Sequence, residues 1–318
     1  MNGEVIEILK NILLLVLGFV MLIKGADWFV DGAASIADRL GISQLVIGLT
    51  IVAMGTSLPE AAVSISAATK GSAEITIGNV LGSNILNVLV ILGLTAVICK
   101  IPVQKSTVCY EIPFTILITI VLAVLGLWDN QVSRVEGGIL WGFMILYLIY
   151  LWKISRNGSA SAEEEEEKKE KKKPVWFLLG MVVVGALMIV KGSDFTVDAA
   201  SSVAKMLGMS ERFIGLTIVA FGTSLPELVT STTAAIKGKT DIAIGNIVGS
   251  NIFNILFVVG TTALITPVAY SGTFIVDSIV AVGAISLLFL CVVKDRKLGR
   301  LGGFIMLVAY AGYFAYIL

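Results

Sequence analysis

The amino-acid sequence predicts an all-α, polytopic membrane protein with ten transmembrane helices arranged as two inverted five-helix repeats. The first observation is composition: 57% of the 318 residues are hydrophobic and 14% are charged, and the mean hydropathy is +0.94. The second is the number of apolar stretches long enough to cross a bilayer, and the third is the similarity between the two halves of the chain. Together they predict an integral membrane protein with almost no length left for a soluble domain.

Apolar stretches supply the predicted helices in order along the chain, because a transmembrane helix needs about 20 mainly apolar residues. The stretches lie near residues 8–30, 42–69, 74–98, 107–127, 135–153, 175–198, 212–236, 241–265, 273–293 and 299–317. The first is expected to be a retained helix. Glu4 and Glu7 stand where a signal peptide has a basic region, and no small-residue cleavage site follows.

The two halves of the sequence align without a gap at an offset of 167 residues (227 − 60). The best-matched segments are IGLTIVAMGTSLPE at 47–60 with IGLTIVAFGTSLPE at 214–227, and IGNVLGSNILN at 77–87 with IGNIVGSNIFN at 244–254. A unit of five helices ends on the opposite side of the membrane from where it began, so its copy enters upside down. The repeat therefore predicts inverted topology.

Basic residues are distributed unequally between the two sides of the predicted bundle. One set of alternate connections holds sixteen: Arg39, Lys100, Lys105, Lys153, Arg156, the five lysines within 168–173, Lys237, Lys239, Lys294, Arg296, Lys297 and Arg300. The other set holds five: Lys10, Lys70, Arg134, Lys205 and Arg212. Because Lys and Arg are enriched in cytoplasmic loops, we expect a multi-pass cell-membrane protein with both termini extracellular.

The strongly charged segment between the halves sets the expected domain organisation. Residues 1–153 form the N-terminal repeat, 154–173 a charged cytoplasmic linker and 174–318 the C-terminal repeat, all within one integrated membrane domain. The linker contains Glu and Lys at four-residue spacing, which supports a solvated helix. Its expected role is to tether the two halves.

Composition also excludes several classes of protein. The 23 basic and 23 acidic residues balance, so membrane lipid is an expected partner and nucleic acid is not. The chain has no histidine, and Cys99, Cys109 and Cys291 lack the spacing of a zinc site or a disulfide framework. No enzyme is expected, because the serines of the repeated motif have neither a histidine base nor a G-x-S-x-G turn. The sequence indicates no cofactor and no obligatory protein partner.

The repeated segment GTSLPE stands inside a stretch long enough to cross a bilayer. A carboxylate at bilayer depth costs about 2.5–3.5 kcal/mol, so Glu60 and Glu227 are expected to face a cavity or a partner. Pro59 has no N–H to donate to the carbonyl of Gly55, and the backbone at 53–56 is expected to be kinked or unwound. Freed carbonyls, hydroxyls and a carboxylate at one depth predict half of a cation site.

The third helix of each repeat carries the second motif, GNxxGSNxxN. Gly78 and Gly82 are four residues apart and permit close backbone approach, while Ser83 and Asn87 share a helix face. Because an axis in the membrane plane relates the two halves, their polar groups are expected to meet near the midplane. The combined set is Thr56, Ser57, Glu60, Ser83, Asn87, Thr223, Ser224, Glu227, Ser250 and Asn254.

These side chains are all hard oxygen ligands, which Ca²⁺ and Na⁺ prefer, and none is a soft ligand for copper or zinc. Two carboxylates are neutralised by one divalent ion or by two monovalent ions. Mutually exclusive occupancy by the two kinds of ion is the elementary requirement of an antiporter. The competing interpretation is a proline kink whose glutamate is protonated and hydrogen-bonded.

Two lysines within the predicted helices, Lys24 and Lys191, have acidic neighbours three and seven residues along the same helix. These neighbours are Asp27, Asp31, Asp194 and Asp198. Ion pairs within each helix and snorkelling at helix ends are the expected explanation. On this interpretation the two glutamates of GTSLPE have no fixed counter-charge.

At these residues the chain resembles a prokaryotic-type, ten-helix member of the sodium/calcium exchanger family, within the cation/calcium exchanger superfamily. The resemblance covers both repeats, through GTSLPE at 55–60 and 222–227 and GN(V/I)xGSNxxN at 78–87 and 245–254. It implies a secondary antiporter that exchanges sodium for calcium by alternating access, with the first and sixth helices sliding across a fixed core. The ion ligands it implies are the carbonyls of Ala53 and Ala220 and the side chains of Thr56, Ser57, Glu60, Ser83, Asn87, Thr223, Ser224, Glu227, Ser250 and Asn254.

Departures from the family pattern bear on the coupling ion. Several related exchangers, including potassium-dependent ones, carry an aspartate where this chain has Asn254, which argues against potassium co-transport. Proton/calcium exchangers typically place a glutamate soon after the GN pair, where this chain has GSN. A proton- or potassium-coupled cation exchanger is the alternative within transport, and an ion channel is the alternative from another class.

Overall fold

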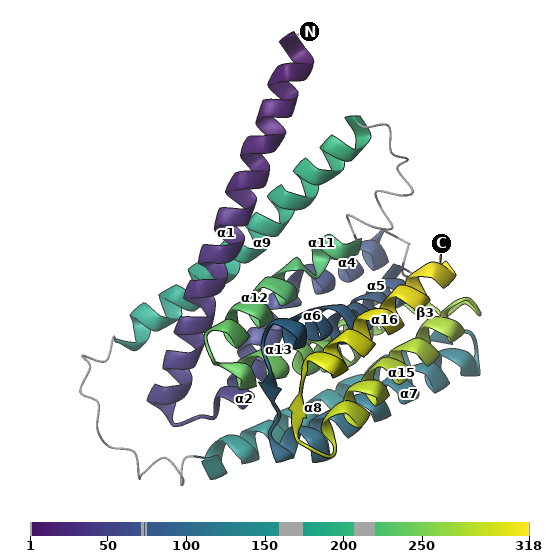
Figure 1. The fold of residues 1–318 in the computed structure, drawn as a ribbon. Coiled ribbons are helices and arrows are strands. Elements are labelled where there is room, and N and C mark those ends of the chain that lie inside the picture. Colours follow the sequence, from purple (N-terminus) through teal and green to yellow (C-terminus); the bar gives the residue numbers. More distant parts are fainter. Residues whose placement is uncertain (1, 71–72, 74, 159–173, 207–219, 318) are drawn as a thin grey trace.

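The computed structural model describes residues 2–70, 73, 75–158, 174–206 and 220–317. Most of the predicted linker and the beginning of the seventh predicted helix lie outside these ranges. The described chain is almost entirely helical, as the composition predicts (Figure 1).

The first half of the chain forms helices over the predicted stretches, with short strands between some of them. Their bounds are α1 Asn2–Leu40, α2 Gln44–Ile47, η1 Gly48–Val52, α3 Ala53–Thr56, α4 Leu58–Thr69, α5 Ile75–Leu86, η2 Asn87–Leu92, α6 Gly93–Ile98, β1 Ile101–Pro102, η3 Thr107–Glu111, α7 Ile112–Trp128, β2 Gln131–Val132 and α8 Arg134–Gly158. The η segments are π-helical turns, which occur mostly as short bulges at functional sites. Local chemistry sets the first boundary: Gly41 adopts φ +63°, and Ser43 caps α2 by accepting from the N–H of Val46 (3.3 Å).

The second half follows the same order. Its elements are α9 Val175–Met206, α11 Ala220–Thr223, α12 Leu225–Ile236, α13 Thr240–Phe253, η6 Asn254–Val259, α14 Gly260–Ile265, β3 Val268–Ala269, α15 Phe274–Val292, β4 Lys297–Leu298 and α16 Arg300–Ile317. Gly238, with φ +75°, makes the tight turn between α12 and α13.

Within the described residues, eight helices are long and apolar enough to cross a membrane. A ninth span is the pair Gln44–Thr56 and Leu58–Thr69, which is bent by 46° at its break. The remaining predicted span, 212–236, is represented by α11 and α12. Two helices exceed their predicted length, because α1 and α9 continue beyond residues 30 and 198 and pack against each other there.

Helices α1 and α9 run side by side and stand apart from the bundle formed by the other helices (Figure 1). Small residues bring their backbones into contact. A Cβ added at Gly18 would lie 2.8 Å from the carbonyl oxygen of Gly192, and one added at Gly25 would lie 2.9 Å from that of Gly185. Such close approach is typical of glycine-lined helix pairs in membranes. The two helices therefore form one tightly packed pair.

Replacing Gly185 with leucine is expected to force this pair apart, because even a Cβ there would lie 2.7 Å from the backbone nitrogen of Phe29. Ion flux in reconstituted vesicles should fall at least about fivefold. Gly180→Leu is the matched control on the same helix, since no described atom lies within 4 Å of a Cβ at Gly180. Equal loss of flux in both variants would contradict the close seam.

Helices α5 and α13 form the centre of the bundle. The apolar window of the segment Thr240–Ile265 is 94% buried and that of Ile75–Ile98 is 72% buried, whereas the windows in the other spans are at most 39% buried. Gly245 and Gly249 of α13 pack directly on η1 and α3: added Cβ atoms would lie 3.0 Å from the oxygen of Leu45 and 2.8 Å from the Cβ of Ala53, respectively. The GNxxG spacing thus permits the close approach that the sequence predicts.

Two short antiparallel clasps join the repeats. Strand β1 pairs with β4, with Ile101 opposite Leu298, and β2 pairs with β3, with Val132 opposite Val268. The offset of 167 residues relates β1 to β3 and β2 to β4. Each clasp therefore becomes the other when the two repeats are exchanged, as expected for halves related by a twofold axis.

Candidate ion-binding site

The polypeptide breaks at the same point in both repeats. In the first repeat α3 ends at Thr56, Ser57 leaves the helix with φ −86° and ψ 8°, and Pro59 lies in the first turn of α4. In the second repeat Ser224 has φ −93° and ψ 5°, and Pro226 lies in the first turn of α12. Proline is accepted in a first turn because the N–H it lacks has no partner within the helix. The repeated GTSLPE motif therefore starts a new helix.

This break lies one residue later than the sequence predicts. Ala53 to Thr56 forms a regular helical turn, in which the N–H of Ser57 donates to the oxygen of Ala53 (3.1 Å). The hydroxyls of Thr56 (3.3 Å) and Ser250 (3.4 Å) also donate to this carbonyl. The physical reason is that only Pro59 lacks an N–H, so the turn before it still closes. The Ala53 carbonyl is shared between several donors instead of being freed.

The two glutamates of the motif lie in the first turns of α4 and α12 and are almost completely buried, with exposed fractions of 1% for Glu60 and 0% for Glu227. A helix N-terminus favours negative charge at this position. Ser57 donates to Oε1 of Glu227 (2.9 Å), and Ser83 donates to Oε1 of Glu60 (3.4 Å). In each glutamate Oε2 has no hydrogen-bond partner.

Hydroxyl groups from both repeats surround the carboxylates. The Oγ atoms of Ser83 and Ser224 are 3.3 Å apart, and Thr56 donates to Oδ1 of Asn246 (3.0 Å). Thr56, Ser57, Ser224 and Ser250 are all buried. The structure thus brings the predicted hydroxyls of the first repeat and the predicted serines of the second repeat to one region between α4, α5, α12 and α13.

The predicted asparagines occupy equivalent places, each at the first residue of a π-helical turn, η2 or η6. Asn87 donates from Nδ2 to Oδ1 of Asn251 (3.0 Å), and Asn254 donates from Nδ2 to Oδ1 of Asn84 (3.1 Å). Both are buried, and the Oδ1 atom of each has no hydrogen-bond partner. The amide nitrogens are therefore held by the opposite repeat while the amide oxygens stay available.

Two predicted ligands are less fully described. Thr223 ends α11 and is only partly buried, and Ala220 is the first residue of that helix. The segment before Ala220 and the side chain of Ala220 lie outside the described residues. The remaining ten predicted positions all lie in the buried region above.

Four asparagines of this region were not predicted as part of the site. Asn84 and Asn251 each donate from Nδ2 to the main-chain oxygen of the other (3.2 Å in both directions), across the twofold axis. Asn79 donates to the main-chain oxygen of Glu60 (3.2 Å), and Asn246 accepts from Thr56. The signal was present in the sequence, since GN and SN of the third helix recur at the same positions in both repeats.

The chemistry of the region is that of a hard-cation site. Most buried polar atoms in proteins have a partner, so an unpartnered buried group needs an explanation. Four acceptor oxygens here have none: Oε2 of Glu60, Oε2 of Glu227, Oδ1 of Asn87 and Oδ1 of Asn254. Carboxylate and amide oxygens suit Ca²⁺ and Na⁺. Among the described residues no cluster of three or more His, Cys, Asp or Glu is present.

The predicted ion pairs within α1 and α9 are half right. Lys191 and Asp194 pair within α9 at 3.1 Å, as the spacing predicts. In α1, however, Asp27 and Asp31 pair with Lys237 from the turn after α12, and the predicted pairing with Lys24 is wrong. The competing partner, Lys237, is more than 200 positions away in the sequence, so helical spacing could not reveal it.

A family profile described as sodium/calcium exchanger protein matches residues 10–153 and 177–318. The chain belongs to the sodium/calcium exchanger family. It is 41% identical to the putative antiporter CaxA of Alkalimonas amylolytica, over 93% of this chain and 95% of that one. It is 32% identical to the sodium/calcium exchanger MaX1 of Methanosarcina acetivorans, over 95% and 97% of the two chains.

The structure of this exchanger is similar to that of the sodium–calcium exchanger NCX_Mj, with a TM-score of 0.83 and 36% sequence identity. The match covers 97% of this chain and 99% of that one. The ten predicted helices and their inverted repeats fit this fold. The chain is therefore a multi-pass membrane transporter that exchanges cations including calcium, and it is not an enzyme.

Proposed function

We propose that this exchanger moves calcium against sodium by alternating access, with both ions competing for the site around Glu60 and Glu227. The observation that carries the proposal is the set of four buried oxygens without partners, two from carboxylates and two from amides. They come equally from the two repeats, as a site on the twofold axis requires. Ion gradients drive such an exchange, so no cofactor takes part.

The proposed ligands fall into three kinds. The carboxylates balance the charge of the ions, the hydroxyls and amide oxygens complete the shell, and main-chain carbonyls contribute at its ends. The full proposed set is Ala53, Thr56, Ser57, Glu60, Ser83, Asn87, Ala220, Thr223, Ser224, Glu227, Ser250 and Asn254. Ca²⁺ takes about 6–8 oxygen ligands, so different subsets serve the two ions.

Charge sets the competition between the ions. One Ca²⁺ neutralises two carboxylates, and so do two Na⁺, so occupancy by one kind of ion excludes the other. A further Na⁺ per cycle would make exchange electrogenic, and current measured during exchange decides this point. Asn87 and Asn254 add no negative charge, which favours sodium over a coupling that needs an additional carboxylate.

Alternating access requires one part of the molecule to move against another. The closely packed α1–α9 pair stands apart from the bundle that holds the site, and it is the proposed moving part. The distribution of basic residues supports a cytoplasmic linker between the two repeats and extracellular termini. Each repeat then faces the membrane in the opposite sense.

Flux measurements in proteoliposomes test the proposed coupling. Vesicles loaded with sodium should take up radioactive calcium from a sodium-free medium, and equal sodium on both sides should abolish this uptake. Imposed potassium or proton gradients are the matched controls. Uptake driven equally well by either gradient in the absence of sodium would contradict the proposal, and rapid calcium flux without any counter-ion would indicate a channel.

Acidification is expected to weaken calcium binding. Protons bind the same two carboxylates, Glu60 and Glu227, and a protonated carboxyl group offers Ca²⁺ no negative charge. The apparent affinity for calcium should therefore fall steadily as the pH is lowered, while saturating calcium restores the rate. Initial rates measured over a range of calcium concentrations at several pH values check this. A pH effect on maximal rate alone would contradict competition at the site.

A further inference from the structure

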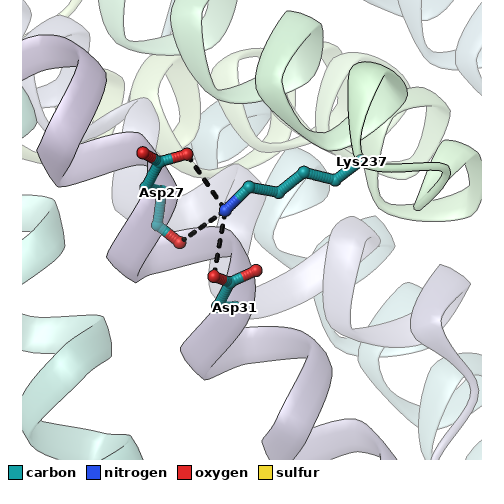
Figure 2. Close-up of polar contacts among 3 residues, drawn as sticks. All are labelled: Asp27, Asp31 and Lys237. Atoms are coloured by element: carbon teal, nitrogen blue, oxygen red, sulfur yellow. Dashed lines mark hydrogen bonds and ion pairs between the residues drawn. The ribbon is translucent and has the colours of Figure 1, made fainter.

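Lys237 joins the moving pair to the bundle (Figure 2). It lies in the turn after α12, and its ammonium group is 3.0 Å from Oδ1 of Asp27 and 2.9 Å from Oδ2 of Asp31, both on α1. It also donates to the main-chain oxygen of Asp27 (3.3 Å). These contacts use all three protons of the ammonium group. We call these three residues the α1 latch.

The α1 latch is partly shielded from water. The exposed fraction of the side chain is 26% for Lys237, 33% for Asp27 and 45% for Asp31. Burial acts to lower the pKa of Lys237, but hydrogen bonds and charges from Asp31 and Asp27 raise it above its ordinary value. Lys237 therefore keeps its positive charge between two carboxylates. Shielded pairs of this kind are screened by salt less than fully exposed ones.

The repeat predicts a counterpart to this cluster. The offset of 167 residues converts the α1 latch into Lys70, Asp194 and Asp198, which we call the α9 latch. This second cluster is open in the structure. Asp194 pairs with Lys191 of its own helix, and within the described part of the chain Lys70 forms no ion pair. Both Lys70 and Asp198 are exposed.

Packing shows the same difference between the repeats. α1 packs along α12, whereas α9 makes at most slight contact with α4, the counterpart of α12. The α1–α9 pair is thus held against one repeat at the end where Lys237 lies, and the equivalent surface of the other repeat is open. When two inverted repeats exchange their arrangements, each contact formed in one half is replaced by its counterpart in the other.

We propose that the α1 latch holds the α1–α9 pair in one of its two positions and that the α9 latch holds it in the other. This inference rests on the alternating-access part of the proposed function. The six residues touch no proposed ion ligand, so their role is to position the moving pair. Movement breaks one latch as it closes the other, which keeps the two positions close in free energy. Lys191 holds Asp194 while the α9 latch is open.

Distances between spin labels test the latches. Labels are attached at Leu40 on α1 and Leu301 on α16, both exposed, in a background without the three native cysteines. Two distances are expected, one for each position of the pair. Lys237→Gln should shift their ratio about fivefold away from the position seen here, in line with the stability of a partly exposed ion pair. Lys70→Gln should shift the ratio in the opposite direction.

Controls separate a latch from a general loss of structure. Lys239→Gln removes a charge from the same turn without touching the aspartates and should leave the ratio unchanged. The exchange Lys237→Asp with Asp31→Lys should restore it. A shift with Lys237→Gln no larger than that with Lys239→Gln, or a shift in the same direction with Lys70→Gln, would refute the latches. One fixed distance in the unsubstituted protein would also refute them, while sodium-driven calcium uptake by that protein would leave the proposed exchange standing.

Discussion

Replacing either Glu60 or Glu227 with glutamine is expected to lower sodium-driven calcium uptake at least about 100-fold. Each substitution keeps the shape of the side chain and an oxygen that accepts from Ser83 or Ser57. It removes one of two negative charges that face each other across the site. Breaking a buried charge pair by removing one partner costs about 3–5 kcal/mol, which corresponds to more than 100-fold in affinity.

The two carboxylates are expected to act as one unit. If a divalent ion needs both charges, the double variant Glu60→Gln with Glu227→Gln should be scarcely worse than either single variant. Initial rates of calcium uptake in proteoliposomes, with protein amount and vesicle orientation matched, provide the comparison. Asp295→Asn is a suitable control, because this aspartate is 57% exposed and pairs only weakly with Lys297 (3.7 Å). Substantial calcium exchange by both single variants would place the ion site elsewhere.

Features that depend on spacing along one helix could be predicted from the sequence. The offset between the repeats predicts the equivalent places of Glu60 and Glu227, and proline predicts a break in each broken helix. The position of the break was wrong by one residue, because Ser57 still has an N–H to close the turn that ends at Thr56. The α9 pair of Lys191 with Asp194 was predicted correctly for the same reason of local spacing.

Contacts between distant segments could not be predicted in this way. Asp27 has Lys24 three residues away in its own helix, yet it pairs with Lys237 because α12 packs along α1. The reciprocal bonds of Asn84 and Asn251 were missed because helical periodicity gives the face of a residue and not its partner across an axis. Exact repetition of an amide residue in both halves is the signal that would have found them.

Substitution of Asn251 by leucine is the second large effect that we expect, with calcium uptake at low calcium reduced about 10- to 100-fold. Leucine has nearly the volume of asparagine, so the packing of α13 is kept. The change removes the acceptor that holds Nδ2 of Asn87 and the donor that reaches the main-chain oxygen of Asn84. A buried polar group left without its partner costs about 1–3 kcal/mol.

The loss should appear mainly in the apparent affinity for calcium, because an unheld Asn87 turns its amide and no longer directs its oxygen into the site. Asn251→Asp keeps an acceptor for Asn87 and should retain more affinity than the leucine variant. Asn84→Leu should reproduce the effect of Asn251→Leu, since Asn254 depends on Oδ1 of Asn84 in the same way. Unchanged calcium affinity in both leucine variants would mean that the axial asparagines support the helices alone, and that Asn87 and Asn254 hold their orientation without them.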